Sequence, residues 1–503
     1  MPSTISSRSA HEATNPRERA SDITATGMNV VTKTSSIESR STLSTNLPPL
    51  VFGTATFNHQ FNANPYALDP QNIVSEALSR GIRAFDTSPY YGPAEQILGD
   101  ALHSYLIKSS STLRNLRRED YFLLTKCGRI AGDEFDYSED WIRFSVRRSC
   151  RRLKTTYLDA VYLHDVEFLA PTEVLGGILA LRRLRDEGLL RHVGICGYPV
   201  EVLATLSELI LDETGEPVDI VQSYANFTIQ NQKLQAFLPR FVTAGVDVVT
   251  NASPLGMGLC RSQGVPLGNS NGQWHPAPDG LRSACLRAAA HVAQRGEKLE
   301  VIALRFSMEQ WLSTGADAGS FGMVPEEAVT SLEERSAVHD AIVTLGAQAQ
   351  PKTIARRMRP RLGVSVMGIS KVSELEETMI VYNSILAHHD PADSDRKRCI
   401  QAATNNIRRT VLGKEWTDFA WTSPESDFVN KRTMFGVSAH EKAEEDAELE
   451  IAAALEDLGS LKSTSKHGAE VSIDEIVIAE QDLVCPVTGM KGQMPSTHAT
   501  ATN

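Results

Sequence analysis

The sequence lacks the features of a membrane or secreted protein. No stretch of its 503 residues approaches the roughly 18 consecutive apolar residues of a transmembrane helix, and the first residues contain no apolar leader segment. The seven cysteines form no Cys-x-x-Cys pair and are odd in number, which is typical of a reduced intracellular chain. We therefore expect a cytoplasmic protein with no membrane contact.

The chain also lacks an excess of basic residues, and its formal net charge is −12. Nucleic-acid binding requires clustered Lys and Arg, so no nucleic-acid partner is expected. With 41% hydrophobic residues, the chain can bury a large core. No metal site is predicted, and the oligomeric state stays open.

Both ends of the chain differ in composition from the middle. Of residues 1–45, 18 are Ser or Thr and none is aromatic, so we predict that residues 1–46 are disordered because they have little apolar area to bury. Residues 391–503 are predicted to form a C-terminal extension that is partly helical and then disordered, with eight acidic residues at 441–457. Trp416, Phe419 and Trp421 indicate that part of this extension packs on the folded domain.

Between these ends, short apolar runs alternate with amphipathic stretches. The runs that fit buried strands lie at 48–56, 82–86, 121–126, 158–164, 192–196, 218–223, 246–253 and 363–369. The helical stretches lie at 73–79, 95–105, 139–154, 172–187, 201–211, 234–244, 281–295 and 301–312. This alternation predicts an α/β (β/α)₈ TIM barrel over 47–390, with 315–360 as a surface insertion. A doubly wound sheet is the second choice, but no Gly-x-Gly-x-x-Gly motif follows the first run.

Polar residues suited to proton transfer end three consecutive predicted strands. These are Asp86, Lys126 and His164, and the carboxyl ends of barrel strands meet at the face where active sites lie. A tyrosine, with an ordinary pKa near ~10, becomes a usable acid or base when a nearby ammonium lowers that pKa. Asp86 would supply the counter-charge that a buried ammonium needs, and His164 would orient the reacting oxygen. The set predicts proton transfer coupled to hydride transfer.

These residues lie in motifs that resemble the aldo-keto reductase family over Leu47–Leu386. Asp-Thr-Ser-Pro-Tyr-Tyr-Gly at 86–92 resembles the family's Asp-Thr-x-x-x-Tyr-Gly block, Lys126 matches its Thr-Lys motif and His164 its Leu-x-His motif. The implied catalytic tetrad is Asp86, Tyr91, Lys126 and His164. Tyr90 is then a neighbour that shapes the substrate pocket.

Further motifs resemble the branch of the family that contains L-galactose dehydrogenases and D-arabinose 1-dehydrogenases. They are Thr-Lys-Cys-Gly-Arg at 125–129, His-Asp-Val-Glu-Phe at 164–168, Ser-Pro-Leu-Gly-Met-Gly at 253–258 and Trp-His-Pro-Ala at 274–277. The resemblance implies oxidation of an aldose at C1 to an aldonolactone, with Trp274 and His275 contacting the sugar. A general NADPH-dependent aldehyde or ketone reductase and a nucleotide-binding regulatory barrel remain as alternatives.

The resemblance also implies a nicotinamide cofactor bound along the strand ends. The residues assigned to it are Gly53, Thr54, Cys196, Gln222, Ser253, Leu255, Gly256, Gly258, Ser370, Lys371 and Glu377. The small residues of the loop at 253–258 fit a close approach to the pyrophosphate. Two positions depart from the family. Cys196 and Gly197 replace a Ser-Asn pair that binds the carboxamide, and Ala252 replaces a Tyr that stacks on the nicotinamide.

The residues after the eighth predicted strand bear on the choice between NAD and NADP. Family members that prefer NADP usually carry an Arg there, whereas this chain has Glu374, Glu376 and Glu377. Carboxylates repel a 2′-phosphate and accept hydrogen bonds from ribose hydroxyls. We therefore expect NAD, with NADP kept as the alternative because Lys371 lies in the same segment.

Overall fold

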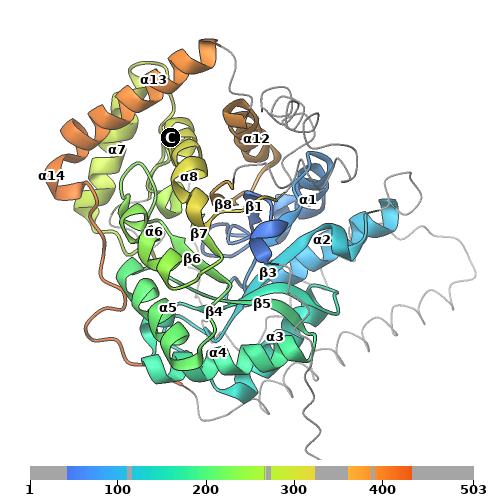
Figure 1. Ribbon diagram of the computed structural model, residues 1–503. Helices are drawn as coiled ribbons and strands as arrows, with labels where there is room; N and C mark the ends of the chain where they lie inside the picture. The colour runs from blue at the N-terminus through green and yellow to red at the C-terminus, as the bar shows by residue number, and fades with distance from the viewer. Residues whose placement is uncertain are drawn as a thin grey trace, which may run out of the picture. The chain divides into compact units, whose positions relative to one another are not determined.

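Eight parallel strands form a closed barrel in the computed structural model, which describes residues 42–109, 116–265, 267, 274–322, 361–386 and 391–432 (Figure 1). The strands are β1 (Leu50–Gly53), β2 (Ala84–Asp86), β3 (Phe122–Cys127), β4 (Leu158–His164), β5 (Leu190–Gly197), β6 (Ile220–Tyr224), β7 (Val248–Ala252) and β8 (Val364–Gly368). Each strand pairs in parallel with its sequence neighbours, and β8 closes the barrel on β1 with Gly53 opposite Gly368. The predicted (β/α)₈ TIM barrel is therefore confirmed.

Two apolar layers hold the barrel together. Inside it, Val51, Leu124, Tyr162 and Val248 come from different strands and are fully buried. Outside it, alternate strand residues such as Phe52 pack against the surrounding helices. Strands that are buried on both faces need continuous apolar runs instead of an alternating pattern, and this is why such runs mark the strands in the sequence.

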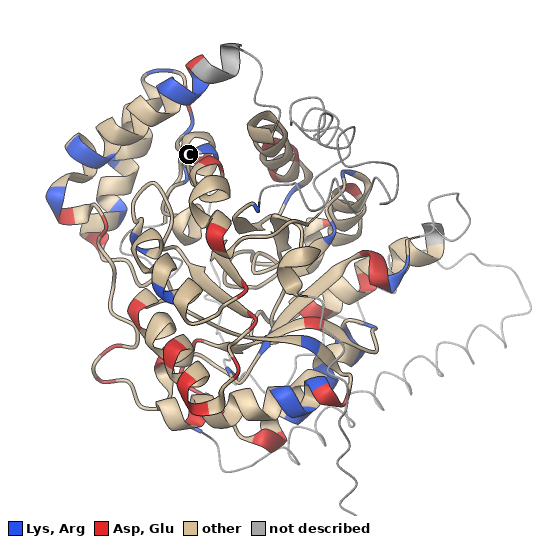
Figure 2. Cartoon of the chain, viewed as in Figure 1, with Lys and Arg blue, Asp and Glu red and all other residues tan. Residues whose placement is uncertain are grey.

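Helices cover the outside of the barrel. They are α1 (Pro70–Ser79), α2 (Ala94–Ser109), α3 (Glu139–Arg152), α4 (Pro171–Asp186), α5 (Val200–Thr214), α6 (Lys233–Thr243), α7 (Asp279–Ala293), α8 (Leu299–Thr314) and α12 (Val372–Leu386). Pro70 and Pro171 begin α1 and α4, where the missing N–H group of proline costs no helical hydrogen bond. Charged residues of both signs lie along α3, which has Glu139 and Asp140 in its first turn, as the helix dipole favours (Figure 2).

The packed chain begins before the boundary expected near Leu47. Leu43 is 2% exposed, and the backbone N–H of Ser44 donates to the Asp247 carboxylate over 2.8 Å. The fully buried Ser320 hydroxyl lies within hydrogen-bond distance of the carbonyl oxygens of Ser44 and Leu47. Residues 42–46 therefore belong to the folded part of the chain, contrary to the prediction of disorder up to residue 46. Residues 1–41 lie outside the described residues.

The segment 315–360, expected as a surface insertion, starts inside the fold. A short 3₁₀ helix, η6 (Gly315–Ala318), follows α8, and Ser320 then pairs with Leu362 in an isolated antiparallel bridge. A Cβ atom at Gly322 would lie 1.9 Å from the Leu47 carbonyl oxygen, so the two backbones are in close contact. Residues 315–322 thus pack beside the chain leading into β1 and are not a surface insertion. Residues 323–360 lie outside the described residues.

Part of the C-terminal extension packs on the helices of the barrel. α13 (Pro391–Asn406) contacts α8, a π-helical segment η7 (Ile407–Leu412) contacts α7, and α14 (Gly413–Trp416) follows (Figure 1). Ile400, Ile407 and Trp421 share a buried apolar cluster with residues of α7 and α8, and Trp416 and Phe419 pack against it. Residues 433–503, with the acidic stretch 441–457, lie outside the described residues.

Within the described ranges, no helix combines the length and apolar character needed to span a membrane. The cysteines in these ranges are all free, five of them buried and Cys399 exposed. Burial raises the pKa of Cys127 and of Cys196 well above the ordinary value of a thiol, so both side chains are neutral near pH 7.

The contacts of Leu43 and Ser44 predict a difference between two deletions. Deletion of residues 1–46 removes both residues, whereas deletion of residues 1–41 keeps them. Loss of a buried leucine typically costs about 2–5 kcal/mol, and one kcal/mol shifts the melting temperature of a large domain by about 2–4 °C. We expect the 1–46 deletion to melt at least about 5 °C below the 1–41 deletion, as measured by circular dichroism. Equal melting temperatures would contradict the packing of Leu43.

Candidate active site

At the carboxyl ends of β2 and β3, Lys126 and Asp86 form an ion pair that is closed off from solvent. Lys126 Nζ lies 2.7 Å from Asp86 Oδ1 and donates a second hydrogen bond of 2.8 Å to the Thr87 carbonyl. The two side chains are 1% and 4% exposed. Because removing two charges from water is costly, a pair this deep requires close contact and further hydrogen bonds, and both are present.

Tyr91 and His164 face this pair from the loop after β2 and from the end of β4. Lys126 Nζ lies 4.9 Å from the centre of the Tyr91 ring, which meets the His164 ring edge-to-face at 5.8 Å. His164 Nδ1 shares a hydrogen bond of 3.1 Å with the Ser88 hydroxyl, which fixes the orientation of the imidazole. The Tyr90 ring lies 5.7 Å from the same imidazole. The four residues of the predicted tetrad therefore lie together at one end of the barrel.

The protonation states follow from burial and from the charge on Lys126. Burial would lower the pKa of Lys126, but Asp86, together with the neighbouring Tyr91 and Cys196, holds the pKa above its ordinary value, so the ammonium is charged. Burial raises the pKa of Tyr91 by more than Lys126 lowers it, so the net shift is upward, opposite to the lowering expected from the sequence. Burial, together with the charges of Lys126 and Arg129, holds the pKa of His164 well below its ordinary value, so the imidazole is neutral.

A cavity of about 420 Å³ opens beside these four side chains, which is a volume suited to a small-molecule ligand. The other residues predicted to bind cofactor or substrate that line it are Gly53, Tyr90, Cys196, Gln222, Ser253 and Trp274. Aromatic rings form much of the wall, and Phe61 meets Trp274 edge-to-face at 4.8 Å. The cavity therefore combines a polar floor with apolar sides.

Two of the predicted ligand residues support the wall from behind. Thr54 is fully buried, and its hydroxyl donates to the Asp86 carbonyl over 3.1 Å. His275 is 2% exposed; one ring nitrogen lies 3.2 Å from the Gly256 carbonyl oxygen, and the other accepts a hydrogen bond from the Ala277 N–H. The His275 ring holds the loop after β7 in place and does not line the cavity, contrary to the predicted sugar contact.

The loop after β7 has an unusual backbone. Ser253, Gly256, Met257 and Gly258 all have positive φ angles, of 54°, 60°, 56° and 102°. Such turns direct backbone N–H groups into a concave surface that favours anions. Ser253 and Met257 line the cavity, whereas Leu255, Gly256 and Gly258 form the turn behind them.

In the segment after β8, Ser370 binds the carboxylate of Glu374. The backbone N–H and the hydroxyl of Ser370 both donate to one carboxylate oxygen of Glu374, each over 2.8 Å. Donors of this kind at the start of a helix, here α12, also hold phosphate groups. The neighbouring Lys371 is exposed. The residues present therefore fit the phosphate end of a nicotinamide dinucleotide.

Ion pairs neutralise the acidic run of α12. The pairs are Glu374 with Arg261 at 3.1 Å, Glu376 with Arg80 at 3.0 Å and Glu377 with Lys298 at 3.4 Å. Each of the three glutamates therefore has a cationic partner, which weakens the repulsion of a 2′-phosphate that we expected from the sequence. Of the three glutamates, Glu374 is the one that contacts Ser370, whereas Glu377 pairs with the exposed Lys298.

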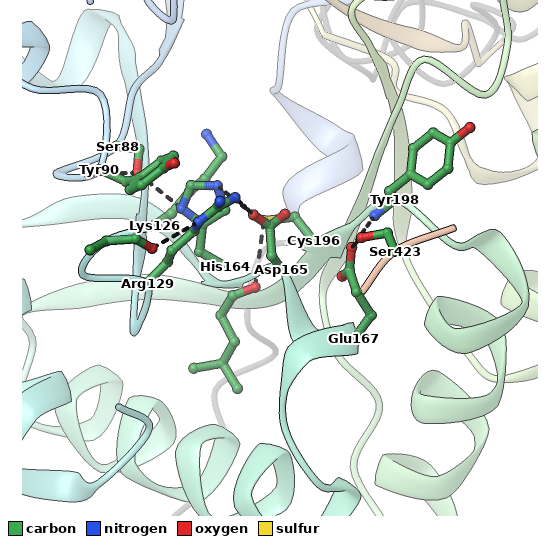
Figure 3. A network of polar contacts seen from close by, with 12 residues as sticks. Ser88, Tyr90, Lys126, Arg129, His164, Asp165, Glu167, Cys196, Tyr198 and Ser423 are labelled. Atoms are coloured by element: carbon green, nitrogen blue, oxygen red, sulfur yellow. Dashed lines mark hydrogen bonds and ion pairs between the residues drawn. The ribbon is translucent and has the colours of Figure 1, made fainter. Parts of the chain in front are cut away.

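A buried carboxyl group lies beside Gly197, the position at which the family that the motifs resemble has an asparagine. Glu167 Oε2 would lie 2.2 Å from a Cβ atom at position 197, so a larger residue there would require the Glu167 carboxyl group to move. Glu167 Oε1 accepts hydrogen bonds from the Tyr198 N–H over 3.1 Å and from the Ser423 hydroxyl over 3.0 Å (Figure 3). A carboxyl group from the loop after β4 thus takes the place of an amide from the end of β5.

Several residues of the cavity wall were not predicted from the sequence. Arg129 and Asp165, each within three residues of a tetrad member, form an ion pair there (Figure 3). Residues of the segment 421–428 also line the cavity, and the Trp421 ring stacks on Tyr198 at 4.2 Å. Proximity to the tetrad in sequence could have identified the ion pair, but no local motif marks the segment 421–428.

The fold and the site match one known family. A model of the Aldo/keto reductase family matches residues 49–396 of the chain. The chain therefore belongs to the aldo/keto reductase family, as its motifs predicted, and is an oxidoreductase of a class that uses nicotinamide cofactors.

Relatives of the chain include three dehydrogenases that are named for sugars. The chain is 41% identical over 271 residues to the D-arabinose 1-dehydrogenase of Saccharomyces cerevisiae, which covers 53% of this chain and 77% of the yeast protein. It is 34% identical over 290 residues to the L-galactose dehydrogenase of Arabidopsis thaliana, covering 56% of this chain and 85% of the plant protein. A D-threo-aldose 1-dehydrogenase of a Pseudomonas species is 25% identical over 293 residues, with coverages of 53% and 83%.

The buried Glu167 predicts a specific pH dependence of stability. Burial, reinforced by Asp165, raises the pKa of Glu167 from 4.5 to about 8. Between these two values the folded state binds a proton that the unfolded state has lost, so the Glu167 contribution is present below pH ~4.5 and is lost as the pH rises to about 8. We expect the free energy of unfolding, relative to that of Glu167→Gln, to fall across this window by up to about 1.4 kcal/mol per pH unit.

The measurement is urea unfolding of both proteins at a series of pH values. Glu187→Gln is the control, because Glu187 forms an exposed ion pair with Arg143 that lowers its pKa. This variant should show no fall across the same window. A difference between the native protein and Glu167→Gln that does not change with pH would contradict the raised pKa.

Proposed function

We propose that the protein oxidises the C1 hydroxyl of an aldose to an aldonolactone, with NAD as the hydride acceptor. The observation that carries this proposal is the convergence of Tyr91, His164 and the buried Lys126–Asp86 pair on one cavity. Oxidation of an alcohol by hydride transfer needs an acid–base group whose proton affinity is set by a fixed charge nearby. The names of the three relatives support an aldose as the substrate.

The side chains divide the proton chemistry among them. The C1–H bond of the sugar breaks and its electron pair leaves as hydride, for which the oxidised nicotinamide supplies the acceptor. Tyr91, as phenolate, takes the proton of the C1 hydroxyl, and the Lys126 ammonium stabilises the phenolate charge. His164, which is neutral, holds the C1 oxygen by a hydrogen bond. A C=O bond forms at C1, so the ring form of the sugar becomes a lactone.

The chain's own residues offer a place for each end of the cofactor. At the nicotinamide end these would be Gly53, Cys196, Gln222 and Ser253, which line the cavity. Tyr224 lies opposite Ala252 in the β6–β7 register and also lines the cavity, so it could supply the aromatic face that Ala252 lacks. At the phosphate end, Ser370 offers two donors.

Glu374 is the reason for proposing NAD over NADP. Its carboxylate pairs with Arg261 and also occupies both Ser370 donors, so a 2′-phosphate arriving there would have to compete with this carboxylate for the same donors. Ribose hydroxyls, by contrast, can donate hydrogen bonds to a carboxylate. The free cysteines support a reducing compartment, and we propose that the protein works in the cytoplasm.

A general carbonyl reductase and a regulatory barrel would make different use of the same cavity. Purified protein with NAD or NADP, a panel of aldoses and a panel of simple aldehydes separates the three by the absorbance of the reduced cofactor. Oxidation of an aldose supports the proposal. Reduction of simple aldehydes alone would identify a general reductase, and cofactor binding without turnover would identify a regulatory protein.

The role of Tyr91 predicts the effect of two substitutions. Tyr91→Phe should lower kcat by about 10²–10⁴-fold and leave the Kd of the cofactor nearly unchanged, because only the proton acceptor is lost. Burial raises the pKa of Tyr91, so the oxidation rate of the native protein should rise with pH into the alkaline range as phenolate forms. Lys126→Met should lower kcat and move this rise to higher pH. Steady-state kinetics across a pH series measure all three effects.

Tyr90→Phe is the matched control, because the Tyr90 ring lies as close to His164 as the Tyr91 ring does. It should keep most of its turnover. If Tyr90→Phe loses turnover and Tyr91→Phe keeps it, the proton acceptor is Tyr90 and not Tyr91.

The contact between Glu374 and Ser370 predicts the cofactor preference. The native protein should have a higher kcat/KM with NAD than with NADP, and Glu374→Gln should shift this ratio toward NADP because it removes the carboxylate that occupies the Ser370 donors and releases Arg261 from its ion pair. Glu376→Gln, which loses a similar ion pair with Arg80 away from Ser370, should leave the ratio unchanged. A native preference for NADP, or equal shifts in both variants, would refute the role of Glu374.

A further inference from the structure

A second buried ion pair, between Arg129 and Asp165, lies in the cavity wall beside the tetrad (Figure 3). Arg129 follows β3 and Asp165 follows β4, and their side chains are 17% and 2% exposed. Asp165 Oδ2 bonds Arg129 Nη1 and lies 3.7 Å from His164 Nε2. The pair is thus in contact with the imidazole that holds the reacting oxygen, yet the proton chemistry does not use it.

The Asp165 carboxylate has bonding capacity to spare. Among the described residues, its Oδ1 atom is buried and has no hydrogen-bond partner. A buried polar atom without a partner typically costs about 1–3 kcal/mol, and more when it carries charge. The backbone of Asp165 is also left-handed, with a φ of 57°, a conformation that non-glycine residues adopt at a cost. Both costs are offset if a ligand in the cavity supplies hydrogen-bond donors to this carboxylate.

The Arg129 guanidinium is held rigidly beside it. Its central carbon lies 3.9 Å from the centre of the Tyr90 ring, with Phe135 and Phe168 at 5.4 Å and 5.6 Å. Within the described part of the chain, the group bonds the Ala131 carbonyl and Asp165. A guanidinium has five N–H donors, so others remain for a ligand. The pair therefore presents an acceptor and a donor at adjacent positions, in an arrangement fixed by aromatic rings.

We propose that the Arg129–Asp165 pair recognises the C2 hydroxyl of the aldose and selects sugars over simple alcohols and aldehydes. A hydroxyl both donates and accepts, so Asp165 takes its hydrogen and Arg129 donates to its oxygen. His164 and Asp165 are consecutive and in contact, and in an aldose the C2 hydroxyl is the neighbour of the C1 oxygen that His164 would hold. This inference rests on the proposed function and adds to it the pair of side chains that determines substrate specificity.

The test compares an aldose with its 2-deoxy analogue. The probes are L-galactose with 2-deoxy-L-galactose, and D-arabinose with 2-deoxy-D-ribose, which is D-arabinose without its C2 oxygen. A hydrogen bond to a charged group is worth about 10- to 150-fold, so the native protein should show a kcat/KM for the full sugar higher by that factor. Asp165→Asn should lower kcat/KM for the full sugar toward the value for the 2-deoxy analogue. It should change kcat/KM for the analogue itself only slightly.

If Asp165 has a purely structural role, Asp165→Asn should lower kcat/KM equally for the sugar and for its 2-deoxy analogue. The ratio of the two kcat/KM values would then stay the same, and this result would overturn the inference. If Asp165→Asn fails to fold because Arg129 loses its counter-charge, the double variant Arg129→Leu with Asp165→Asn removes both charges and takes its place. Asp427→Asn is the control, since it neutralises another carboxylate of the cavity wall, one that is exposed. It should leave the ratio of the two substrates unchanged.

The outcomes separate this inference from the function on which it rests. If the native protein oxidises aldoses but does not distinguish them from their 2-deoxy analogues, the inference fails and the proposed function stands. If it oxidises no aldose and reduces simple aldehydes, the proposed function fails and the inference falls with it. Each variant is also titrated with NAD, with quenching of protein fluorescence as the signal. The Kd for NAD should be the same as that of the native protein.

Discussion

The buried ion pair between Lys126 and Asp86 is the constraint on which the rest of the site depends. Its two members come from neighbouring strands of the barrel, and removing either would leave an uncompensated charge at a typical cost of about 3–5 kcal/mol. The ammonium also faces the Tyr91 ring and helps to keep His164 neutral. A shift of β3 against β2 would therefore disturb the charge pair, its contact with the Tyr91 ring and its effect on the pKa of His164 together.

The wall around this pair is built from parts of the chain that are far apart. The loops after β3 and β4 supply the Arg129–Asp165 pair, and the segment 421–428 from the C-terminal extension also lines the cavity, with the Phe428 ring 4.8 Å from that of Phe168. Glu167 joins the two through the Ser423 hydroxyl. In the function that we propose, the Lys126–Asp86 pair serves proton transfer and the Arg129–Asp165 pair binds the substrate; the two sets of residues are in contact through His164 and Asp165, which are consecutive in sequence.

The fold, and the meeting of Asp86, Tyr91, Lys126 and His164 at one end of the barrel, could be predicted because their signals are local. Strands buried on both faces leave apolar runs, and Asp86, Lys126 and His164 are the last residues of three of these runs. The sequence also showed that Gly197 stands where the family has an asparagine. That Glu167 lies beside Gly197 depends on how two loops approach each other, which residue spacing does not predict. For the same reason His275, predicted at the sugar, packs behind the wall, and the burial that reverses the expected pKa shift of Tyr91 appears only in three dimensions.

The central claim is that hydride leaves C1 of an aldose while the site removes the proton of its hydroxyl. Mass spectrometry of the products formed from an aldose that carries deuterium at C1 tests this directly. The account predicts that the reduced cofactor gains one deuterium, that the aldonolactone contains none, and that the rate is slower than with the unlabelled sugar if hydride transfer limits turnover. Deuterium retained in the oxidised sugar, or absent from the reduced cofactor, would contradict it.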